Sequence, residues 1–427
     1  MISPHFPPDS SAGTHRVRLL APYLADFGWN PTVLTVSEQD YEGRIDPELA
    51  SLVPTTLDVV RIRALPVDLT RPLGVGDLGL RALAGLGRAA WRLHRTRSFD
   101  AVFVTIYPTY PAVIGPMMKR RFGVPFVLDY QDPWVGAWGL SVGGGRNGRV
   151  DAKSRWTRAV AARLEPSVLR AADGVTAVSA RTYEDAVQRT RSAPRAVAEI
   201  PIGWDLADVD AVTSRPAHPA LIARDGRLNI CYAGTLLPLG VATLRAVLAG
   251  ARALIERDSR LADRLRFHFF GTSNQTTGGA PRVLPHAREL GVEHLVREHT
   301  ARLDYLDALD ALRQADALLL LGSSEPHYTP SKVFPALLAN RPLVAVYHEQ
   351  STVVELLRAA APPPASHVIT FGGGRPVEGT VGCIADALRR LLCATGSEVA
   401  IDRAALEPWS ARTLAGRLAA VCDRIAA

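Results

Sequence analysis

Short apolar runs alternate with longer amphipathic stretches along nearly the whole chain, and this alternation constrains the fold more than any other feature. The runs have the length of strands and are rich in Val, Ile and Leu. Most of them have no polar face, which is typical of strands buried on both sides of a parallel sheet. The stretches between them have helical periodicity, as in repeated βαβ units. The chain is therefore expected to be an α/β protein with doubly wound sheets.

The alternation occurs in two successive series, which predict two tandem Rossmann-like domains. A length of 427 residues suits two domains of ordinary size. We place the first domain at 1–205, together with a final crossing helix at 407–427, and the second at 206–406. Ligands of such sheets bind beyond the carboxyl ends of the strands, so two facing domains predict a cleft. The expected strands are 31–36, 57–62, 101–106, 125–129, 174–179, 228–233, 266–270, 317–321, 343–347 and 367–371.

The charge balance is mildly basic, with 49 basic and 42 acidic residues and a net charge of +7. This excess favours anionic partners such as nucleoside diphosphates or acidic lipid, but it is too small to indicate nucleic acid. The four cysteines lack metal-ligand spacing and are expected to be free thiols. No transmembrane run or secretory signal is expected, since the best apolar candidate, 99–118, is broken by prolines. The brevity of the first strand, at 1–3, suggests that the natural start lies upstream.

The most informative segment follows the strand that ends at Leu321. A polar loop comes next, and a helix is expected to begin near Ser331 with Lys332 in its first turn. A lysine there opposes the helix dipole, which favours anions at an N-terminus. A bound diphosphate would remove that conflict. The alternative is a lysine solvated at the surface.

Two segments of the first half also carry candidate groups. A Gly/Ser loop with Gly13 opens a helix that contains Arg16, and such a loop offers backbone N–H groups to an anion. An ordinary turn with a helix cap would explain it equally well. Asp129 and Asp132 fall at the carboxyl end of a buried strand, where α/β enzymes place working groups. We expect Asp132 to act directly in a site and Asp129 to hold backbone.

Taken together, these features resemble the family-4-type glycosyltransferases of the GT-B fold. In that family the first domain opens with a strand, two prolines, a glycine loop, a helix, a glycine and a Thr-Val-Leu strand. The second domain has two strands that each end in glycine, then an acidic loop, a lysine-containing helix and a proline-led strand. The matching segments, which together cover most of the chain, are Pro7-Pro8, Gly13, 16–27, Gly28, 32–36, 232–235, 269–272 and 325–346.

The resemblance implies a nucleotide-diphosphate sugar as donor, bound mainly by the second domain, with no other cofactor. It implies an acceptor face on the first domain, with Asp132, Glu325 and Lys332 as the catalytic residues. The implied contacts are Gly13 and Arg16 at the donor phosphate or acceptor, Asp132 near the reacting carbon, Gly234 and Thr235 at the diphosphate, Gly271 and Thr272 near the nucleoside, Glu325 at the donor sugar, Tyr328 elsewhere at the nucleotide sugar, and Ser331 and Lys332 at the phosphates.

The chain departs from the family pattern at two places. The basic pair that usually follows the first glycine of the second domain is missing after Gly234, so Lys332 and backbone groups would have to meet the phosphate charge. The second glutamate, which commonly holds the ribose hydroxyls, falls at Pro335. Ribose recognition and donor identity therefore do not follow from the resemblance.

The expected function is transfer of a sugar, of hexosyltransferase type, to a saccharide, lipid-linked or small-molecule acceptor, as in polysaccharide biosynthesis. The resemblance implies retention of anomeric configuration, whereas inversion would follow if Asp132 were a general base. A nucleotide-sugar epimerase of the same fold and a degenerate sugar-nucleotide-binding protein are the alternatives. Asp208-Val-Asp210 matches a metal-binding DxD pattern, but it lies where helix capping is expected, so no metal is expected.

Residues 81–97 form a candidate basic helix with Trp91 as an aromatic anchor, and Lys119-Arg120-Arg121 adds cations to the same domain. Such a face can lie on acidic lipid, in which case the acceptor is a lipid-linked saccharide. The alternative is a helix packed on its sheet with a solvated outer face and a soluble acceptor. The protein is expected in the cytoplasm, either free or peripheral at the inner face of the plasma membrane.

Overall fold

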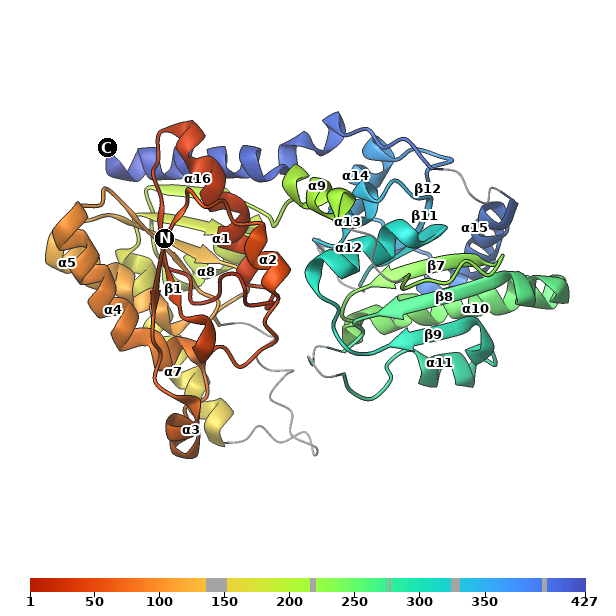
Figure 1. Ribbon diagram of the computed structural model, residues 1–427, viewed down its shortest axis with the longest axis horizontal. Coiled ribbons are helices and arrows are strands. Elements are labelled where there is room, and N and C mark those ends of the chain that lie inside the picture. The colour runs from red at the N-terminus through yellow and green to blue at the C-terminus, as the bar shows by residue number, and fades with distance from the viewer. Residues whose placement is uncertain (136–151, 216–219, 274, 276–277, 324–330, 394–397) are drawn as a thin grey trace. The chain divides into compact units, whose positions relative to one another are not determined.

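The computed structural model describes residues 1–135, 152–215, 220–273, 275, 278–323, 331–393 and 398–427, with backbone only for 152–158 (Figure 1). The chain divides into two compact units. The first unit is Met1–Gly203 with Trp409–Ala427, and the second is Trp204–Pro408. The boundaries placed from the sequence, at 205 and 407, lie within two residues of these positions.

The first unit has a parallel sheet that is joined through the first residues of the chain. One part has the order β1-β2 and the other β3-β4-β5-β6. Ile2 forms bridges to Leu34 and Val104, so residues 1–3 take the place of a strand between β1 and β3. The strands are β1 (Thr32–Val36), β2 (Asp58–Ile62), β3 (Val102–Thr105), β4 (Phe126–Tyr130), β5 (Gly174–Ala177) and β6 (Ala196–Glu199).

Helices cover both faces of this sheet (Figure 1). On one face α16, from the end of the chain, packs with α1 through a core that includes Val17, Leu20 and Leu414. On the other face α4 and α5 contribute Leu86 and Ile114 to a second core. The α-helices are α1 (Thr14–Leu20), α2 (Pro47–Ser51), α3 (Val67–Thr70), α4 (Leu78–Arg97), α5 (Ile114–Phe122), α7 (Ala152–Ala171), α8 (Ala180–Thr190) and α16 (Ala411–Ala426); the 3-10 helices are η1 (Ala21–Phe27), η2 (Glu38–Asp40), η3 (Arg71–Leu73) and η4 (Tyr110–Val113).

The second unit has one parallel sheet of the order β12-β11-β10-β7-β8-β9. The chain moves outward from β7 through β8 to β9, then returns to β10 on the other side of β7 and moves outward to β12. The order of strands therefore reverses between β7 and β10, which is where a doubly wound sheet opens a crevice for ligands. The strands are β7 (Leu228–Ala233), β8 (Leu265–Phe270), β9 (Val296–His299), β10 (Ala317–Leu321), β11 (Leu343–His348) and β12 (Ser366–Phe371).

The helices of the second unit complete an α/β fold of the doubly wound kind, as the sequence predicted. The α-helices are α9 (Leu206–Ser214), α10 (Val241–Arg257), α11 (Leu284–Glu289), α12 (Tyr305–Gln314), α13 (Val333–Leu338), α14 (Thr352–Ala360) and α15 (Val381–Cys393); the 3-10 helices are η5 (Pro238–Gly240), η6 (Ser259–Arg264), η7 (Glu293–Leu295), η8 (Val377–Thr380) and η9 (Ala404–Trp409).

One helical segment of the described chain, Pro238–Arg257, is long and apolar enough by length and composition to cross a membrane. The sequence analysis considered only 99–118 and overlooked it. Its side chains Leu244, Val247 and Leu254 belong to the core of the second unit, where α10 packs against α15. A buried core helix passes the same test of composition, and this packing identifies α10 as such a helix.

Candidate functional site

The loop that follows β7 lies at the point where the strand order of the second sheet reverses. Its glycine, Gly234, has φ of +133°, a conformation that residues with a side chain rarely adopt. The Gly234 amide donates to the Phe270 carbonyl at 2.8 Å, and the Leu236 amide donates to the Thr272 carbonyl at 3.0 Å. These bonds fix the loop after β7 against the loop after β8, so both glycine loops predicted from the sequence lie together.

Lys332 lies over the Gly234 loop. Its ammonium donates to the Thr235 carbonyl at 2.8 Å and to the Tyr232 hydroxyl at 3.1 Å, and it lies 5.2 Å from the centre of the Tyr232 ring. A Cβ atom at Gly234 would come within 2.6 Å of Nζ, so only glycine lets the lysine approach this closely. The structure therefore brings Gly234, Thr235 and Lys332 together at the carboxyl edge of the sheet, and the half-buried lysine does not extend freely into solvent.

Gly271 and Thr272, which the resemblance places near the nucleoside, differ in the groups that they leave open to a ligand. Gly271 has φ of +66° and lies beside the backbone of Arg302. The Thr272 side chain is fully buried, and its hydroxyl donates to the Glu298 carboxylate at 2.6 Å. Its hydroxyl is therefore engaged inside the protein, and the prediction of a ligand contact applies only to its backbone.

Glu298 is a positioning residue that the sequence analysis missed. Besides the Thr272 hydroxyl, its carboxylate accepts hydrogen bonds from three successive backbone amides, at distances between 2.8 and 3.2 Å. These amides begin at Arg282 and end at Leu284, where α11 starts. One half-buried carboxylate thus fixes the loop after β8 and the start of a helix in a single arrangement.

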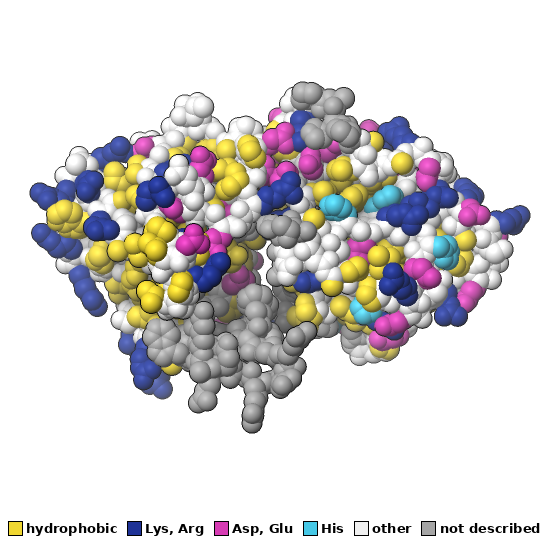
Figure 2. Space-filling model, turned by 60° about the horizontal axis from the view of Figure 1, so that its bottom comes forward, with side chains coloured by type: hydrophobic (Ala, Val, Ile, Leu, Met, Phe, Trp, Pro, Cys, Tyr) yellow, Lys and Arg dark blue, Asp and Glu magenta, His cyan; other side chains and the backbone are white. Residues whose placement is uncertain are grey.

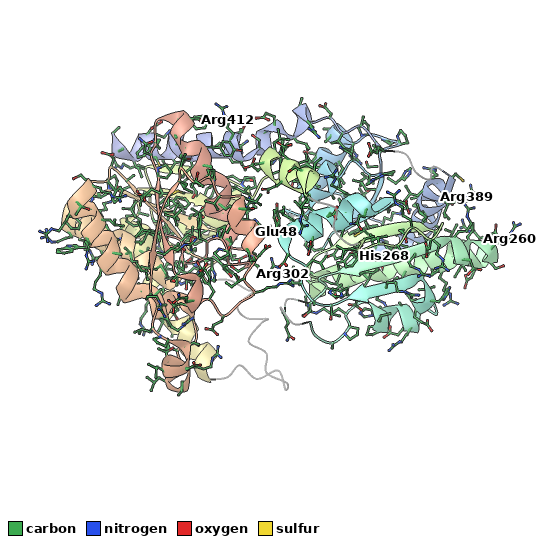
Figure 3. The ribbon with its side chains drawn as sticks, viewed as in Figure 1. Glu48, Arg260, His268, Arg302, Arg389 and Arg412 are labelled. Atoms are coloured by element: carbon green, nitrogen blue, oxygen red, sulfur yellow. The ribbon has the colours of Figure 1, made fainter. Side chains whose placement is uncertain are left out.

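Two arginines near the glycine loops were also missed. The Arg282 guanidinium donates to the Leu236 carbonyl at 2.9 Å, which places a second cation beside the loop that lacks the basic pair of the family. The backbone of Arg302, which follows β9, lies beside Gly271. Figure 3 labels this arginine. Neither position carries a local sequence signal, because both arginines reach the loop through the fold. Lys332 and Arg282 therefore bring positive charge to the loop after β7 from two separate segments.

The structure corrects the expected start of the helix near Lys332. The helix α13 begins at Val333, and Lys332 itself occupies the N-cap position, without a side-chain cap. Ser331 is exposed and is not the cap that the sequence predicted. Pro335 lies in the first turn, where its missing N–H costs no intrahelical bond. Glu325 and Tyr328 lie outside the described residues, so their predicted contacts stay predictions.

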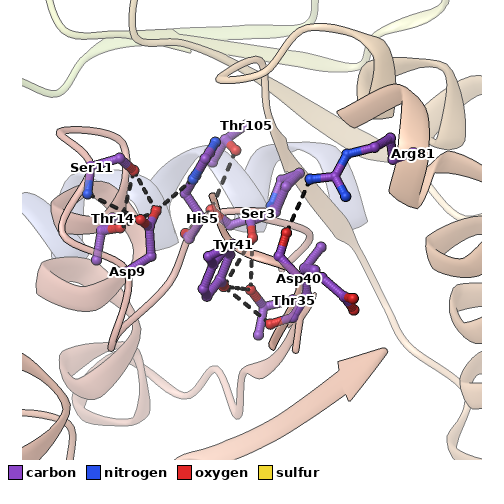
Figure 4. Close-up of polar contacts among 12 residues, drawn as sticks. Ser3, His5, Asp9, Ser11, Thr14, Thr35, Asp40, Tyr41, Arg81 and Thr105 are labelled. Atoms are coloured by element: carbon purple, nitrogen blue, oxygen red, sulfur yellow. Dashed lines mark hydrogen bonds and ion pairs between the residues drawn. The ribbon is translucent and has the colours of Figure 1, made fainter. Parts of the chain in front are cut away.

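A polar cluster lies at the corresponding reversal of strand order in the first unit, just after the Ile2 bridge (Figure 4). Asp9 is 2% exposed, and its carboxylate contacts His5 Nδ1 and the Ser11 hydroxyl, each at 2.5 Å. It also accepts a hydrogen bond from the Thr14 hydroxyl at 3.2 Å. Burial alone would raise the pKa of Asp9, but the hydrogen bonds from His5 and Ser11 and the charge of His5 outweigh it, and the pKa is lowered.

We expect Asp9 to make the first unit sensitive to acid. A carboxylate whose pKa is lower in the folded than in the unfolded state contributes stability above its unfolded pKa, and this contribution is lost as the pH falls through the folded pKa. An Asp9→Asn variant should lose about 1–3 kcal/mol at pH 7, because the cluster would lose a charged acceptor. As the pH falls below 3.8, the ordinary pKa of an aspartate, the free energy of unfolding of Asp9→Asn should decrease less than that of the wild type.

Urea unfolding followed at a series of pH values tests this expectation. Asp185→Asn on the exposed side of α8 is a suitable control, and it should follow the wild type at every pH. Parallel acid losses in the wild type and in Asp9→Asn would contradict the role given to Asp9.

The sequence analysis predicted ligand contacts for two further residues of this unit, Gly13 and Arg16. Gly13 is buried against the ring of Tyr107, and a Cβ atom there would lie 2.8 Å from Cε1, so the ring itself requires a glycine. Arg16 is 1% exposed, and its guanidinium donates to both oxygens of Asp129 and to the Ile200 carbonyl. The prediction that Arg16 contacts a ligand is therefore wrong, because its hydrogen bonds are made inside the protein. Asp129 holds this side chain rather than backbone.

Asp132 follows β4 at the carboxyl edge of the first sheet, as the sequence predicted. It is exposed, although surrounding protein atoms partly desolvate its carboxylate and raise its pKa. The neighbouring Gln131 is 8% exposed, and its amide nitrogen has no hydrogen-bond partner within the described part of the chain. An exposed carboxylate and a buried amide group thus follow each other in the chain at the carboxyl edge of the sheet.

The Asp208-Val-Asp210 pattern does not form a pair of metal ligands. Asp205 caps α9, and the buried Asp208 accepts a hydrogen bond from the Tyr305 hydroxyl at 2.7 Å, whereas Asp210 is exposed. In the described ranges no group of three or more His, Cys, Asp or Glu side chains could hold a metal ion. All four cysteines are free thiols, as expected.

Comparisons with known proteins agree with this architecture. Residues 12–203 match the family described as "Glycosyl transferase 4-like domain". Among solved structures, HepE from Anabaena in complex with UDP and glucose aligns over 98% of this chain and 97% of its own, with a TM-score of 0.54 and 15% identity. A glycosyltransferase from Rickettsia africae aligns over 99% and 97%, with a TM-score of 0.56 and 11% identity. A UDP-forming trehalose-phosphate synthase from Burkholderia vietnamiensis aligns over 82% and 76%, with a TM-score of 0.51 and 13% identity.

No curated protein sequence gives a significant match. The structural matches establish the fold. The family match ends at Gly203, where the chain passes from the first unit into the second. Both agree with the resemblance drawn from the sequence. The chain therefore has the GT-B fold, and its residues 12–203 match the glycosyl transferase 4-like domain.

Proposed function

We propose that this protein transfers a hexose from a nucleoside diphosphate sugar to a hydroxyl group of a saccharide, lipid-linked or small-molecule acceptor. The observation that carries the proposal is the position of Lys332, held over the Gly234 loop where the strand order of the second sheet reverses. The HepE structure was solved with UDP and glucose, which supports a uridine nucleotide as donor. Arg282 supplies positive charge that the missing basic pair would otherwise have given.

Glycosyl transfer needs stabilisation of the diphosphate as it leaves. Fixed donors aimed at the developing charge contribute most when they are already in place before the reaction. The Lys332 ammonium is fixed by Thr235 and Tyr232, so little reorganisation would be needed. We assign acceptor recognition to the first unit, with Asp132 and Gln131 as the groups that contact the reacting hydroxyl.

The proposed transfer retains the anomeric configuration. In a retaining reaction of this kind the departing phosphate takes the proton of the acceptor, and no protein nucleophile is required. If Asp132 instead removes that proton, the configuration inverts. Nuclear magnetic resonance of the product, made from a donor of known configuration, distinguishes retention from inversion. An inverted product would indicate that Asp132 is the general base.

Binding and turnover of nucleotide sugars test the proposed class of reaction. At a UDP concentration of about 100 times the dissociation constant, bound ligand should stabilise the protein by about 2.7 kcal/mol, visible as a rise in melting temperature. Incubation with UDP-sugars should release UDP through transfer or slow hydrolysis. A C2-isomerised sugar nucleotide would indicate an epimerase instead, and binding without any turnover would indicate a degenerate binding protein.

The proposal includes no metal and no further cofactor. The DxD-like pair is spread over a buried and an exposed position, and Asp208 is engaged by Tyr305. Transfer activity should therefore persist in the presence of a chelator such as EDTA. Loss of activity on chelation, with recovery on addition of magnesium or manganese, would contradict this part of the proposal. The proposed place of action is the cytoplasm, where nucleotide sugars are made.

A further inference from the structure

The positive charge of the chain is concentrated in one short part of the first unit. The segment from Leu78 to Leu128 carries a net charge of +7, which equals the net charge of all 427 residues. The remainder of the chain is therefore neutral overall. This segment contains α4, β3 and α5. Its charged residues are Arg81, Arg88, Arg92, Arg95, Arg97, Lys119, Arg120 and Arg121, with Asp100 as the single acid.

Most of these cations lie on one face, which we call the α4–α5 face. On α4, Arg88, Trp91, Arg92 and Arg95 recur at helical spacing and are exposed, whereas Leu86 on the other side is buried against the sheet. On α5 the exposed residues are Met117, Arg120 and Arg121. We define the α4–α5 face by these seven exposed residues.

The two helices form one continuous surface. The rings of Trp91 on α4 and Phe122 on α5 lie 6.4 Å apart, and a Cβ atom at Gly87 would lie 3.6 Å from the Met117 methyl group. The Arg95 guanidinium lies 4.7 Å from the centre of the Trp91 ring. Figure 2 shows dark-blue side chains gathered with yellow ones at the left end of the first unit, the end at which Figure 1 places α4 and α5.

The arginines of this face differ from the cations at its margins in their charge partners. Cations at its margins are paired, as Arg97 is with Asp58 and Lys119 is with Asp173. In contrast, no ion pair found within the described residues involves the five arginines of the face, Arg88, Arg92, Arg95, Arg120 and Arg121.

Two large apolar side chains lie among these arginines. Trp91 is 38% exposed and Met117 is 40% exposed. Tryptophan is favoured where apolar and polar layers of a bilayer meet, and arginine can place its stem in that layer while its head stays in water. Contacts to the phosphates of a nucleic-acid duplex would need the cations alone, whereas exposed tryptophan and methionine gain from a partner with an apolar layer.

We propose that the α4–α5 face binds the surface of a bilayer that contains anionic lipid. The attraction comes from the unpaired arginines, each worth roughly 1 kcal/mol near such a surface, and Trp91 and Met117 enter the headgroup boundary. The inference goes beyond the proposed function, because it rests on neither the donor nor the acceptor. It adds an interaction surface to the first unit, on elements separate from Asp132 and the polar cluster at Asp9.

Vesicle flotation with the full chain tests the proposal. The wild type should float with vesicles of phosphatidylcholine and phosphatidylglycerol but not with phosphatidylcholine alone, and raising the salt concentration should release it. Replacing Arg88 and Arg92 together by glutamine should weaken binding about 30-fold, the value expected for two charges. Trp91→Ala should weaken binding about 10-fold, because a large apolar side chain no longer enters the boundary.

The control removes the same charge elsewhere. Arg389, labelled in Figure 3, and Arg390 are exposed on α15 in the second unit, so replacing both by glutamine should leave flotation unchanged. All variants should keep the same stabilisation by UDP, which separates this proposal from the proposed function. Equal binding to both vesicle types, equal loss in the control, or binding to a DNA oligonucleotide in place of vesicles would each overturn it.

Discussion

Replacing Lys332 by alanine is expected to lower kcat/KM for sugar transfer by about 10²- to 10³-fold, the usual cost of losing one fixed donor to a developing charge. The ammonium lies over the Gly234 loop and is fixed by Thr235 and Tyr232. Alanine would leave the loop without that cation at the point where the diphosphate is proposed to bind. The measurement is steady-state transfer with a UDP-sugar that the wild type accepts, combined with the thermal shift caused by UDP.

Two further variants separate charge from packing. Tyr232→Phe removes the hydroxyl that contacts Lys332 but keeps the lysine bonded to the Thr235 carbonyl, so its effect should stay within about 10-fold. Lys332→Arg keeps the charge but not the compact shape beside Gly234, so it should recover binding of UDP only in part. A Lys332→Ala protein with an unchanged UDP shift and unchanged turnover would remove the basis of the proposed function.

The interior strands could be predicted from the sequence because burial on both faces leaves a wholly apolar run. The expected strand at 317–321 agrees with β10 at both ends, and 228–233 agrees with β7. The two strands that were missed, β6 and β9, lie at the edges of their sheets. In β9, Val-Arg-Glu-His, the exposed or half-buried positions carry polar or charged residues, so no apolar run marks the strand. The strand β6, Ala-Val-Ala-Glu, has only three apolar residues before Glu199, which is too short a run to mark it.

The site could be predicted only where the sequence order itself places residues at a sheet edge. Gly234 and Lys332 follow two strands that lie side by side, so their meeting follows from the topology. Arg282 contacts the Leu236 carbonyl and Glu298 contacts the Thr272 hydroxyl, both far away in sequence, and no spacing rule connects these residues. Arg16 was misread for a related reason, since a polar residue near a glycine loop suggests a ligand until its buried partner is known.

The second large effect is expected at the buried ion pair of Arg16 and Asp129. Arg16→Met should destabilise the first unit by about 3–5 kcal/mol, because it leaves the buried Asp129 carboxylate without its counter-charge. Arg16 is 1% exposed and Asp129 is fully buried. The carboxylate accepts from Arg16 Nε at 2.9 Å and from the Thr176 hydroxyl at 2.6 Å. Asp129→Asn should cost a similar amount, since the buried guanidinium then lacks its anion.

The double variant Arg16→Met/Asp129→Leu, compared with Arg16→Met and Asp129→Leu alone, decides whether the loss comes from the pair or from the space it fills. If the cost of each single change is an isolated buried charge, removing both charges should restore much of the stability, and the double variant should be less destabilised than the sum. The exposed pair Arg412 and Asp26, at 2.8 Å, is the matched control, and Arg412→Met should cost less than about 1 kcal/mol. Because a chain of two units need not unfold in one step, hydrogen exchange of the β4 and β5 amides is the measurement to use. Additive losses in the double variant would mean that Arg16 stabilises the sheet edge through its packing and its bond to Ile200, and not through the ion pair.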